Sequence, residues 1–234
     1  EDSSRPTTFK IRYLVENQKM FRVSRLKEHG LQKQVEEKII KEINKSASKV
    51  QAILISDFVY GVITPRILET ITELSAKHSL LVFGDLQCSS QIGNVSKFKE
   101  FMLLCPTERE ARVAMANQDD SVEFVANLLI EKTRSRNLIL KLGGEGLIAY
   151  AQDSNSDFIH RHYYPALVSN PVDVAGAGDS MLAAVAVSLT QGLSLFEAAA
   201  LGSCVSAIAV QTVGNIPVEI SDLKHFISRM ENAY

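Results

Sequence analysis

Apolar residues follow two different periods along this 234-residue chain. Short, almost continuously apolar runs predict buried strands at 51–57, 79–85, 101–105 and 137–143, with a further short strand at 146–150. Between and after them, apolar positions three and four residues apart predict amphipathic helices, the last three at 176–191, 194–210 and 221–231. Thr64 and Pro65 predict the start of one of the earlier helices, and Asp119 or Asp120 is expected to cap another. Such strands, separated by helices, predict an α/β fold with a mainly parallel sheet covered by helices on both faces.

The first thirty residues have a different pattern. Residues 7–15 and 19–25 are short, partly alternating segments joined by a polar turn, which predicts a β-ribbon. Two strands alone are marginal in water, so we expect the ribbon to lie on another part of the protein. We therefore divide the chain into a ribbon segment, 1–30, and an α/β domain, 31–234.

Composition narrows the possible partners. The net charge is −2 with 22% charged and 46% hydrophobic residues, so we expect a folded chain without a basic field for nucleic acid. The longest apolar run, around 201–210, is too short and too rich in small residues to span a membrane. We expect neither nucleic acid nor membrane as a partner.

The chain has three cysteines, Cys88, Cys105 and Cys204, and no Cys-x-x-Cys motif. Cys105 and Cys204 stand among apolar residues, which predicts buried, reduced thiols. This pattern predicts a cytoplasmic protein without a zinc site.

The stretch DVAGAGDSMLAA, residues 173–184, carries the clearest chemistry. Gly176, Ala177 and Gly178 would present backbone N–H groups at the start of a helix, where the helix dipole favours an anion. Asp179 follows at once, and a carboxylate beside an anion hole fits phosphoryl transfer to a hydroxyl. Taken alone, the motif also fits close helix packing with Asp179 as a cap. The chain contains neither G-x-G-x-x-G nor G-x-x-x-x-G-K-[ST].

Three segments together resemble the ribokinase-like, or PfkB, carbohydrate kinases. DVAGAGDSM resembles the family's D-T-x-G-A-G-D signature, KLGGEGLIAY (141–150) its strand and glycine turn along ATP, and CPTEREA (105–111) its P-N-x-x-E-A segment. The resemblance implies a three-layer ribokinase-like fold and ATP-dependent sugar phosphorylation with Mg²⁺.

The N-terminal part is similar to one branch of that family. Residues 5–25 resemble the lid ribbon of bacterial heptose-7-phosphate kinases, and SDFVYGVITP (56–65) resembles their S-D-Y-x-K-G-x-x-T-P segment. That branch supplies ADP-heptose for lipopolysaccharide, and its ribbon helps to form a dimer. The resemblance implies a sugar or sugar phosphate as the acceptor, heptose 7-phosphate as the best single choice, and a homodimer formed through the ribbon.

The resemblance also implies roles for individual residues. Asp179 would be the catalytic base, and Gly176, Ala177 and Gly178 the anion hole. Asp173 would support a neighbouring site for a monovalent cation such as K⁺. Three glycines, Gly143, Gly144 and Gly146, would lie along ATP, and Gly214 and Asn215 would belong to a loop that closes over it. Ser203 and Gly202 would lie near the adenine. Small residues such as Gly202 also serve helix packing.

Four charged residues complete the expected site. Glu110 would act on Mg²⁺ through bound water, or it is a solvated helix carboxylate. Lys141 is equally compatible with a phosphate contact and with a solvent-facing strand position. Asp57, in the SDF segment, and Asp85, before the polar loop LQCSSQ (86–91), are expected to bind the sugar, although that loop equally fits an ordinary turn.

The sequence departs from the family at three points. Thr107 stands where the family has asparagine, and Tyr60 where heptose kinases have lysine. Family members also carry a segment before the ribbon, with core strands and a glycine-glycine sugar motif, that nothing here matches. We therefore expect the larger part of a sugar kinase, which alone binds ATP weakly and does not phosphorylate a sugar efficiently. The alternatives are a kinase-fold binding protein without transfer activity and a kinase of a vitamin-like alcohol, whose relatives lack the ribbon.

Overall fold

A β-hairpin precedes an alternating series of strands and helices. The computed structural model describes residues 2–15, 18–87, 93–153 and 158–232. The strands are β1 (Phe9–Val15), β2 (Gln18–Arg25), β3 (Ala52–Asp57), β4 (Leu81–Leu86), β5 (Leu103–Leu104), β6 (Asn137–Lys141), β7 (Leu147–Gln152) and β8 (Ile159–Tyr164). The helices are α1 (Lys33–Ala47), α2 (Pro65–His78), α3 (Glu108–Met115), α4 (Val122–Thr133), α5 (Ala177–Thr190), α6 (Leu195–Ala209) and α7 (Ile220–Glu231), with short 3₁₀ turns at Val95–Lys97 and Gly143–Glu145.

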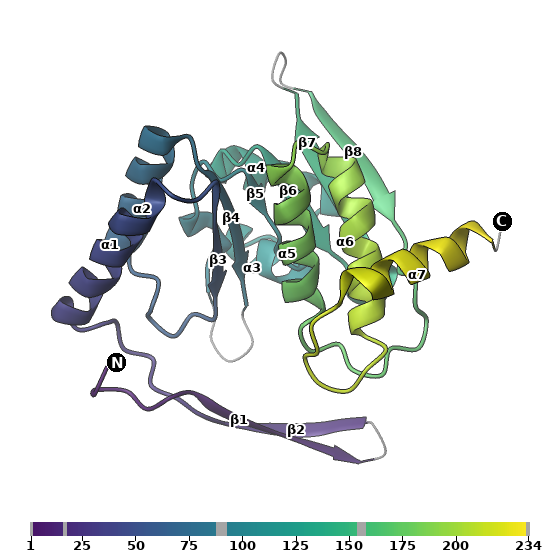
Figure 1. Cartoon of the computed structure of the whole chain (residues 1–234), viewed down its shortest axis with the longest axis horizontal. Coiled ribbons are helices and arrows are strands. Elements are labelled where there is room, and N and C mark those ends of the chain that lie inside the picture. The colour runs from purple at the N-terminus through teal and green to yellow at the C-terminus, as the bar shows by residue number, and fades with distance from the viewer. Residues whose placement is uncertain (1, 16–17, 88–92, 154–157, 233–234) are drawn as a thin grey trace.

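One sheet organises the body of the molecule (Figure 1). Its strand order in the described residues is β3-β4-β5-β6-β7-β8. The strands from β3 to β6 pair in parallel, and β7 and β8 pair antiparallel. The carboxyl ends of β3, β4, β5 and β6 therefore lie on one edge, where ligands bind in open α/β sheets.

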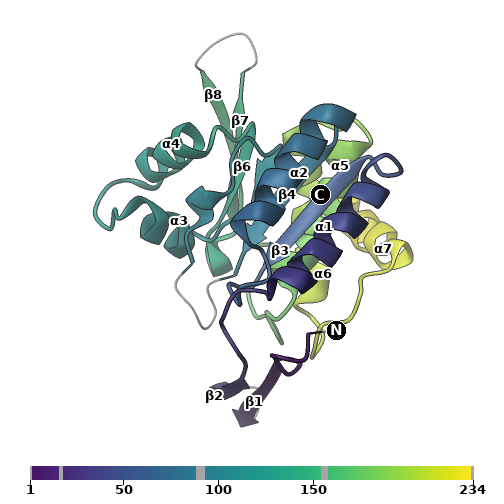
Figure 2. The same ribbon diagram turned by 90° about the vertical axis from the view of Figure 1, so that its left-hand side faces the viewer.

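Helices cover both faces of this sheet (Figures 1 and 2). Leu138 and Leu140 of β6 pack in the same core as residues of α2, α3 and α4, whereas Ile139 between them packs with α5 and α6. This alternation explains the nearly continuous apolar runs, because a strand covered on both faces needs apolar residues at every position. The predicted three-layer α/β class is confirmed.

The ribbon of β1 and β2 lies below the carboxyl ends of β3 and β4 in Figure 1. Its strands pair antiparallel, and the rings of Tyr13 and Phe21 stack with centroids 4.4 Å apart. The ribbon meets the body through Lys10, whose Nζ lies 4.9 Å from the ring centroid of Phe58 and 5.1 Å from that of Tyr60. The expected ribbon is confirmed, but its face with Tyr13 and Phe21 is exposed.

Three local predictions were wrong or incomplete. The strand expected over 101–105 is reduced to Leu103–Leu104, and α3 was not predicted. Asp119 or Asp120 was expected to cap α4, but Ser121 is the N-cap, and its side chain accepts a hydrogen bond from the backbone N–H of Phe124 at 3.2 Å. Asp120 instead accepts a hydrogen bond from the Asn117 side chain in the preceding turn.

The cysteines and histidines of the described residues differ in burial. Cys105 is buried, as predicted, and burial raises the pKa of its thiol. Cys204 is only partly buried, and Cys88 lies outside the described residues. His160 and His162 are exposed on β8. Among the described residues no helix is long and apolar enough to cross a membrane.

Candidate active site

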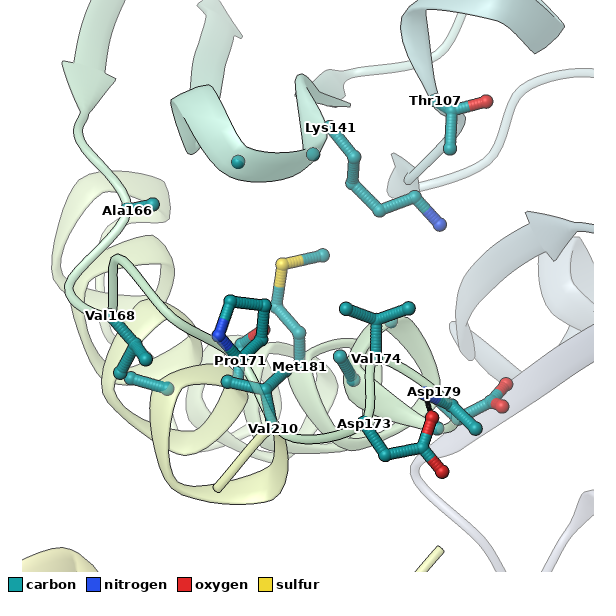
Figure 3. Close-up of a pocket in the computed structure, with 18 of the residues that line it drawn as sticks. Thr107, Lys141, Ala166, Val168, Pro171, Asp173, Val174, Asp179, Met181 and Val210 are labelled. Carbon is teal, nitrogen blue, oxygen red and sulfur yellow. Dashed lines mark hydrogen bonds between the residues drawn. The ribbon is translucent and has the colours of Figure 1, made fainter. Parts of the chain in front are cut away.

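A cavity of about 830 Å³ lies at the carboxyl edge of the sheet, beside the start of α5 (Figure 3). Lys141 enters it from the end of β6, while Asp173, Val174 and Asp179 border it from the segment that leads into α5. Every site residue predicted from the sequence lines this cavity except Asp57 and Gly202: Asp85, Glu110, Lys141, Gly143, Gly144, Gly146, Asp173, Gly176, Ala177, Gly178, Asp179, Ser203, Gly214 and Asn215.

Asp57 lies elsewhere because alternate strand residues point to opposite faces. Its side chain is 3% exposed, forms an ion pair with Lys97 and accepts a hydrogen bond from the backbone N–H of Val59 at 2.9 Å. Its neighbour Ser56 points to the α5 face instead, where its hydroxyl contacts Asp179. Of the Ser-Asp pair, the structure therefore brings Ser56 rather than Asp57 to the site.

The turn before α5 has the geometry of an anion hole. Gly176 is the N-cap, with a left-handed φ of 80°, and no side chain caps the helix there. The first N–H groups of a helix have no intrahelical partner. At the start of α5 the Ala177 N–H makes only a long contact, 3.4 Å, with the carbonyl of Val174, so this helix end can face an anion beside the cavity. A Cβ on Gly176 would lie 2.0 Å from Oδ1 of Asn215, so this turn requires glycine.

Asp173 connects this turn to the loop after α6. Its Oδ1 accepts a hydrogen bond from the backbone N–H of Ala175 at 3.0 Å, and its Oδ2 accepts one from that of Gly214 at 3.2 Å. The carboxylate is buried and joins its own segment to Gly214, 41 residues further along the sequence. It thereby fixes the loop carrying Gly214 and Asn215 against the anion hole.

The Asp179 carboxylate lies in the first turn of α5. Its Oδ1 accepts hydrogen bonds from Nε2 of Gln87 at 2.7 Å and from Oγ of Ser56 at 3.3 Å. Its negative charge is favoured at this helix end, as in many capped helices. A carboxylate held this way beside N–H donors can accept a proton close to a bound phosphate.

A second carboxylate, Asp85, forms a buried ion pair with Lys141. Nζ of Lys141 lies 2.9 Å from each oxygen of Asp85, which is completely buried. Burial raises the pKa of the Asp85 carboxyl, and Lys141 opposes this effect. Burial disfavours the charge of Lys141, but the neighbouring Asp85 raises the pKa of the lysine. We therefore treat Lys141 as cationic.

Lys141 is also close to the anion hole. A Cβ on Gly178 would lie 3.3 Å from Nζ of Lys141. The glycine leaves the ammonium next to the backbone of the turn, so a phosphate there would meet both N–H groups and a positive charge. Of the two interpretations of Lys141 left open by the sequence, the solvent-facing one does not apply, because the side chain is only 16% exposed.

Glu110 lies in the first turn of α3, on the other side of the cavity. Its Oε2 accepts a hydrogen bond from the backbone N–H of Thr107 at 2.8 Å, and the Thr107 hydroxyl caps the helix in return. Glu110 is 8% exposed, so it is not a solvated helix carboxylate. Within the described ranges no three metal-ligating side chains form a cluster.

Apolar side chains line the end of the cavity away from Asp179. They belong to Val168, Pro171, Met181, Ala207 and Val210. Ser203 also lines the cavity, and its Oγ is buried without a hydrogen-bond partner within the described part of the chain. An apolar lining of this kind fits a flat heterocycle.

The glycines near this end differ in their roles. A Cβ on Gly202 would lie 2.6 Å from Val185, so this glycine serves the packing of α6 against α5. Gly146 has a φ of 104° and contacts the backbone of Tyr164. Gly143 and Gly144 have nothing within 4 Å of a built Cβ, so they leave open space along the cavity.

Sequence reasoning missed three residues that line the cavity, and it noted a fourth, Gln87, only as part of the polar loop 86–91. Lys10, Arg12 and Phe58 line it, and Gln87 contacts Asp179. Lys10 and Arg12 alternate with apolar residues on β1, which is a signal of a charged ribbon face. No pattern in the sequence, however, indicates that this face meets the cavity.

The fold and site together define an α/β protein whose cavity, at the carboxyl edge of the sheet, combines the start of a helix, a nearby carboxylate and an apolar lining. The family profile of the pfkB carbohydrate kinases matches residues 1–221, and the chain belongs to this family. The family predicted from the sequence is confirmed.

Individual relatives agree with this assignment. The bifunctional protein HldE of Trichlorobacter lovleyi is 28% identical over 226 residues, which cover 95% of this chain and 44% of the relative. The chain thus spans less than half the length of such curated relatives. A ribokinase from Thermotoga maritima has a similar fold, with a TM-score of 0.71 at 21% identity over 96% of this chain and 70% of that chain. Phosphofructokinase-2 of Escherichia coli, solved with potassium, gives a TM-score of 0.72 at 15% identity over 90% and 67%.

Proposed function

We propose that this chain is the kinase part of an ATP-dependent sugar-phosphate kinase, which transfers the γ-phosphoryl group to a sugar hydroxyl. One observation carries the proposal: Asp179 stands in the first turn of α5, directly beside the anion hole of Gly176, Ala177 and Gly178, at the cavity. A general base and an anion hole at one helix end are the two parts that phosphoryl transfer to an alcohol requires.

The chain's own residues divide the work in this proposal. Asp179 accepts the proton of the acceptor hydroxyl while the hydroxyl oxygen bonds to the γ-phosphorus and the bond from phosphorus to ADP breaks. The N–H groups of the anion hole and the Lys141 ammonium stabilise the negative charge on the transferring group. The apolar end of the cavity, with Ser203, takes the adenine.

Two cations belong to the proposal. Mg²⁺, implied by the family, would be held near Glu110 through water and would neutralise charge on the phosphate oxygens. A monovalent cation such as K⁺ would lie beside Asp173, whose carboxylate joins the two loops there. Phosphofructokinase-2, which shares the fold, was solved with potassium.

For the acceptor, we propose a phosphorylated sugar. Lys10 and Arg12 bring two positive charges from the ribbon to the cavity mouth, and neither forms an ion pair within the described residues. Heptose 7-phosphate is the best single candidate, because the chain is similar to HldE proteins and its ribbon resembles that of heptose kinases. Tyr60 departs from the lysine of those kinases, but Nζ of Lys10 lies over its ring.

A homodimer formed through the ribbon completes the proposal. Its outward face carries Phe9, Tyr13, Phe21 and Val23, each at least 42% exposed. A second copy of the ribbon would bury these side chains.

The base assignment is tested with Asp179→Asn in the complete polypeptide. We expect phosphoryl transfer to fall about 10²–10⁴-fold while ATP affinity changes little, because a base acts in the transition state. Transfer is measured by coupled ADP release and ATP affinity by calorimetry. Near-normal turnover of the variant would contradict the base assignment. Lack of transfer in the unsubstituted protein would instead favour a kinase-fold binding protein, for which Thr107, in place of the family's asparagine, is the supporting departure.

The acceptor class is tested by an ADP-release screen over sugars and sugar phosphates. We expect phosphorylated sugars to be preferred, and Lys10→Ala and Arg12→Ala to raise the KM of a phosphorylated sugar. Preference for an unphosphorylated sugar would end the heptose-phosphate hypothesis.

A further inference from the structure

Two side chains from the sheet hold one oxygen of the candidate base. Nε2 of Gln87 donates to Oδ1 of Asp179 at 2.7 Å, and Oγ of Ser56 donates to the same atom at 3.3 Å. In the described part of the chain, Oδ2 of Asp179 has no such donor. The carboxylate is therefore held asymmetrically, with one oxygen engaged and one left for another partner.

Both donors are fixed by the sheet and not by the helix that carries Asp179. Ser56 lies on β3 and pairs in register with Asp85 of β4. Gln87 directly follows β4, and its backbone N–H donates to the carbonyl of Asp57 at 2.8 Å, which extends the parallel ladder by one residue. Strand alternation places Ser56, Asp85 and Gln87 on the same face, toward α5.

This arrangement restricts the rotation of the carboxylate about its last side-chain bond. A side-chain amide N–H is a good donor to an anion and cannot itself take up a proton at neutral pH. A base must lie within hydrogen-bond distance of the proton that it removes, and small displacements of reacting groups are costly.

We propose that Gln87, assisted by Ser56, is a positioning residue for Asp179 and directs Oδ2 toward the acceptor hydroxyl. The inference depends on the proposed function of Asp179. In the transfer step the acceptor O–H bond breaks, its proton goes to Oδ2, and the acceptor oxygen forms the new bond to phosphorus as ADP leaves. Gln87 and Ser56 exchange no proton and keep their hydrogen bonds to Oδ1 throughout.

The test compares Gln87→Met and Gln87→Glu in the complete polypeptide. Methionine keeps the length of the side chain but removes the donor, and glutamate keeps the shape but brings a second carboxylate against Asp179. We expect kcat to fall about 10–100-fold with methionine and further with glutamate, while the KM for ATP changes less than about threefold. A merely structural role would give the opposite order, because glutamate is the closer match in size and polarity.

Two further comparisons sharpen the result. Ser56→Thr keeps the hydroxyl and should retain kcat better than Ser56→Ala. Gln191→Met, at the other end of α5, should leave both kcat and KM unchanged. Unchanged melting temperatures in all variants would separate positioning from loss of fold.

The outcomes distinguish this inference from the proposed function. If Asp179→Asn abolishes transfer but Gln87→Met keeps normal kcat, the positioning role is wrong and the base assignment stands. If Gln87→Met lowers the KM of the acceptor and raises kcat, Gln87 occupies the place of the acceptor hydroxyl, and the inference is again wrong. If Asp179→Asn is fully active, the base assignment fails, and the positioning role of Gln87 fails with it.

Discussion

At Gly178 we expect one added methyl group to lower activity without lowering stability. Gly178 is helical, in the first turn of α5, and a Cβ there would lie 3.3 Å from Nζ of Lys141. Alanine is favoured over glycine inside a helix by about 1 kcal/mol, so Gly178→Ala should not lower the free energy of unfolding. We expect kcat to fall about 10²-fold, because the methyl group would stand between the phosphate and its N–H donors and ammonium.

Denaturant unfolding and steady-state kinetics on the same preparation check this prediction. Gly30→Ala is the matched control, because a Cβ there has nothing within 4 Å, and it should leave kcat unchanged. Full activity of Gly178→Ala would mean that the phosphate does not approach this turn.

Also at the residue scale, the sequence predicted those parts of the site that are contiguous in the chain. It did not predict those that depend on which face of a strand a side chain occupies. The Gly-Ala-Gly-Asp run is contiguous, so its anion hole and carboxylate could be predicted together. The sequence could not predict whether Ser56 or Asp57 reaches the site. Residues 52–55 are apolar at every position, so no alternation shows which residues of the strand point to which face of the sheet. Gln87 was noted only as part of a polar loop.

Among the elements, α1 and α2 are joined by a charged contact. Glu36 of α1 accepts hydrogen bonds from the Thr64 hydroxyl, at the N-cap of α2, and from Nη1 of Arg66. The hydrogen bond from Thr64, together with Arg66, lowers the pKa of the Glu36 carboxyl. A lowered carboxyl pKa stabilises the fold above the ordinary pKa, and this stabilisation is lost as the pH falls through the lower value.

Glu36→Gln should therefore destabilise the protein at pH 7, and the difference from the wild type should narrow below about pH 4. Thermal unfolding of both proteins between pH 3 and pH 7 measures it. Glu37→Gln, the exposed neighbour on the same helix, should show no such narrowing. A difference that stays constant across this pH range would show that the contact acts by packing and not by charge.

Element boundaries were predictable where side chains cap them. Thr64 and Pro65 predicted the start of α2, and Thr64 does accept a hydrogen bond from the Ile67 N–H. The short helix α3 was missed because its buried residues other than Glu110 are Ala111 and Ala114, which give little hydrophobic signal.

At the scale of the whole molecule, the alternation of apolar strands and helices in the sequence predicted a sheet between two layers of helices. The sequence did not predict where the ribbon lies. Lys10 meets Phe58 and Tyr60 across about fifty residues of sequence, and only the tertiary fold brings them together. The same fold leaves two apolar surfaces open. One is the outward face of the ribbon, and the other is the edge strand β3, where Leu54 is 45% exposed beside a groove along α1.

Unpaired strand edges and exposed apolar faces favour association, so residues 1–234 produced alone should not remain monomeric. Light scattering at micromolar concentration should give a mass well above the 25.8 kDa of one chain. Phe21→Glu combined with Val23→Glu should restore the monomer if the ribbon forms the contact, whereas Leu54→Glu should do so if the β3 edge does. Circular dichroism would confirm that each variant is folded. A monodisperse monomer of the unmodified chain at every concentration would show that neither surface binds a second copy.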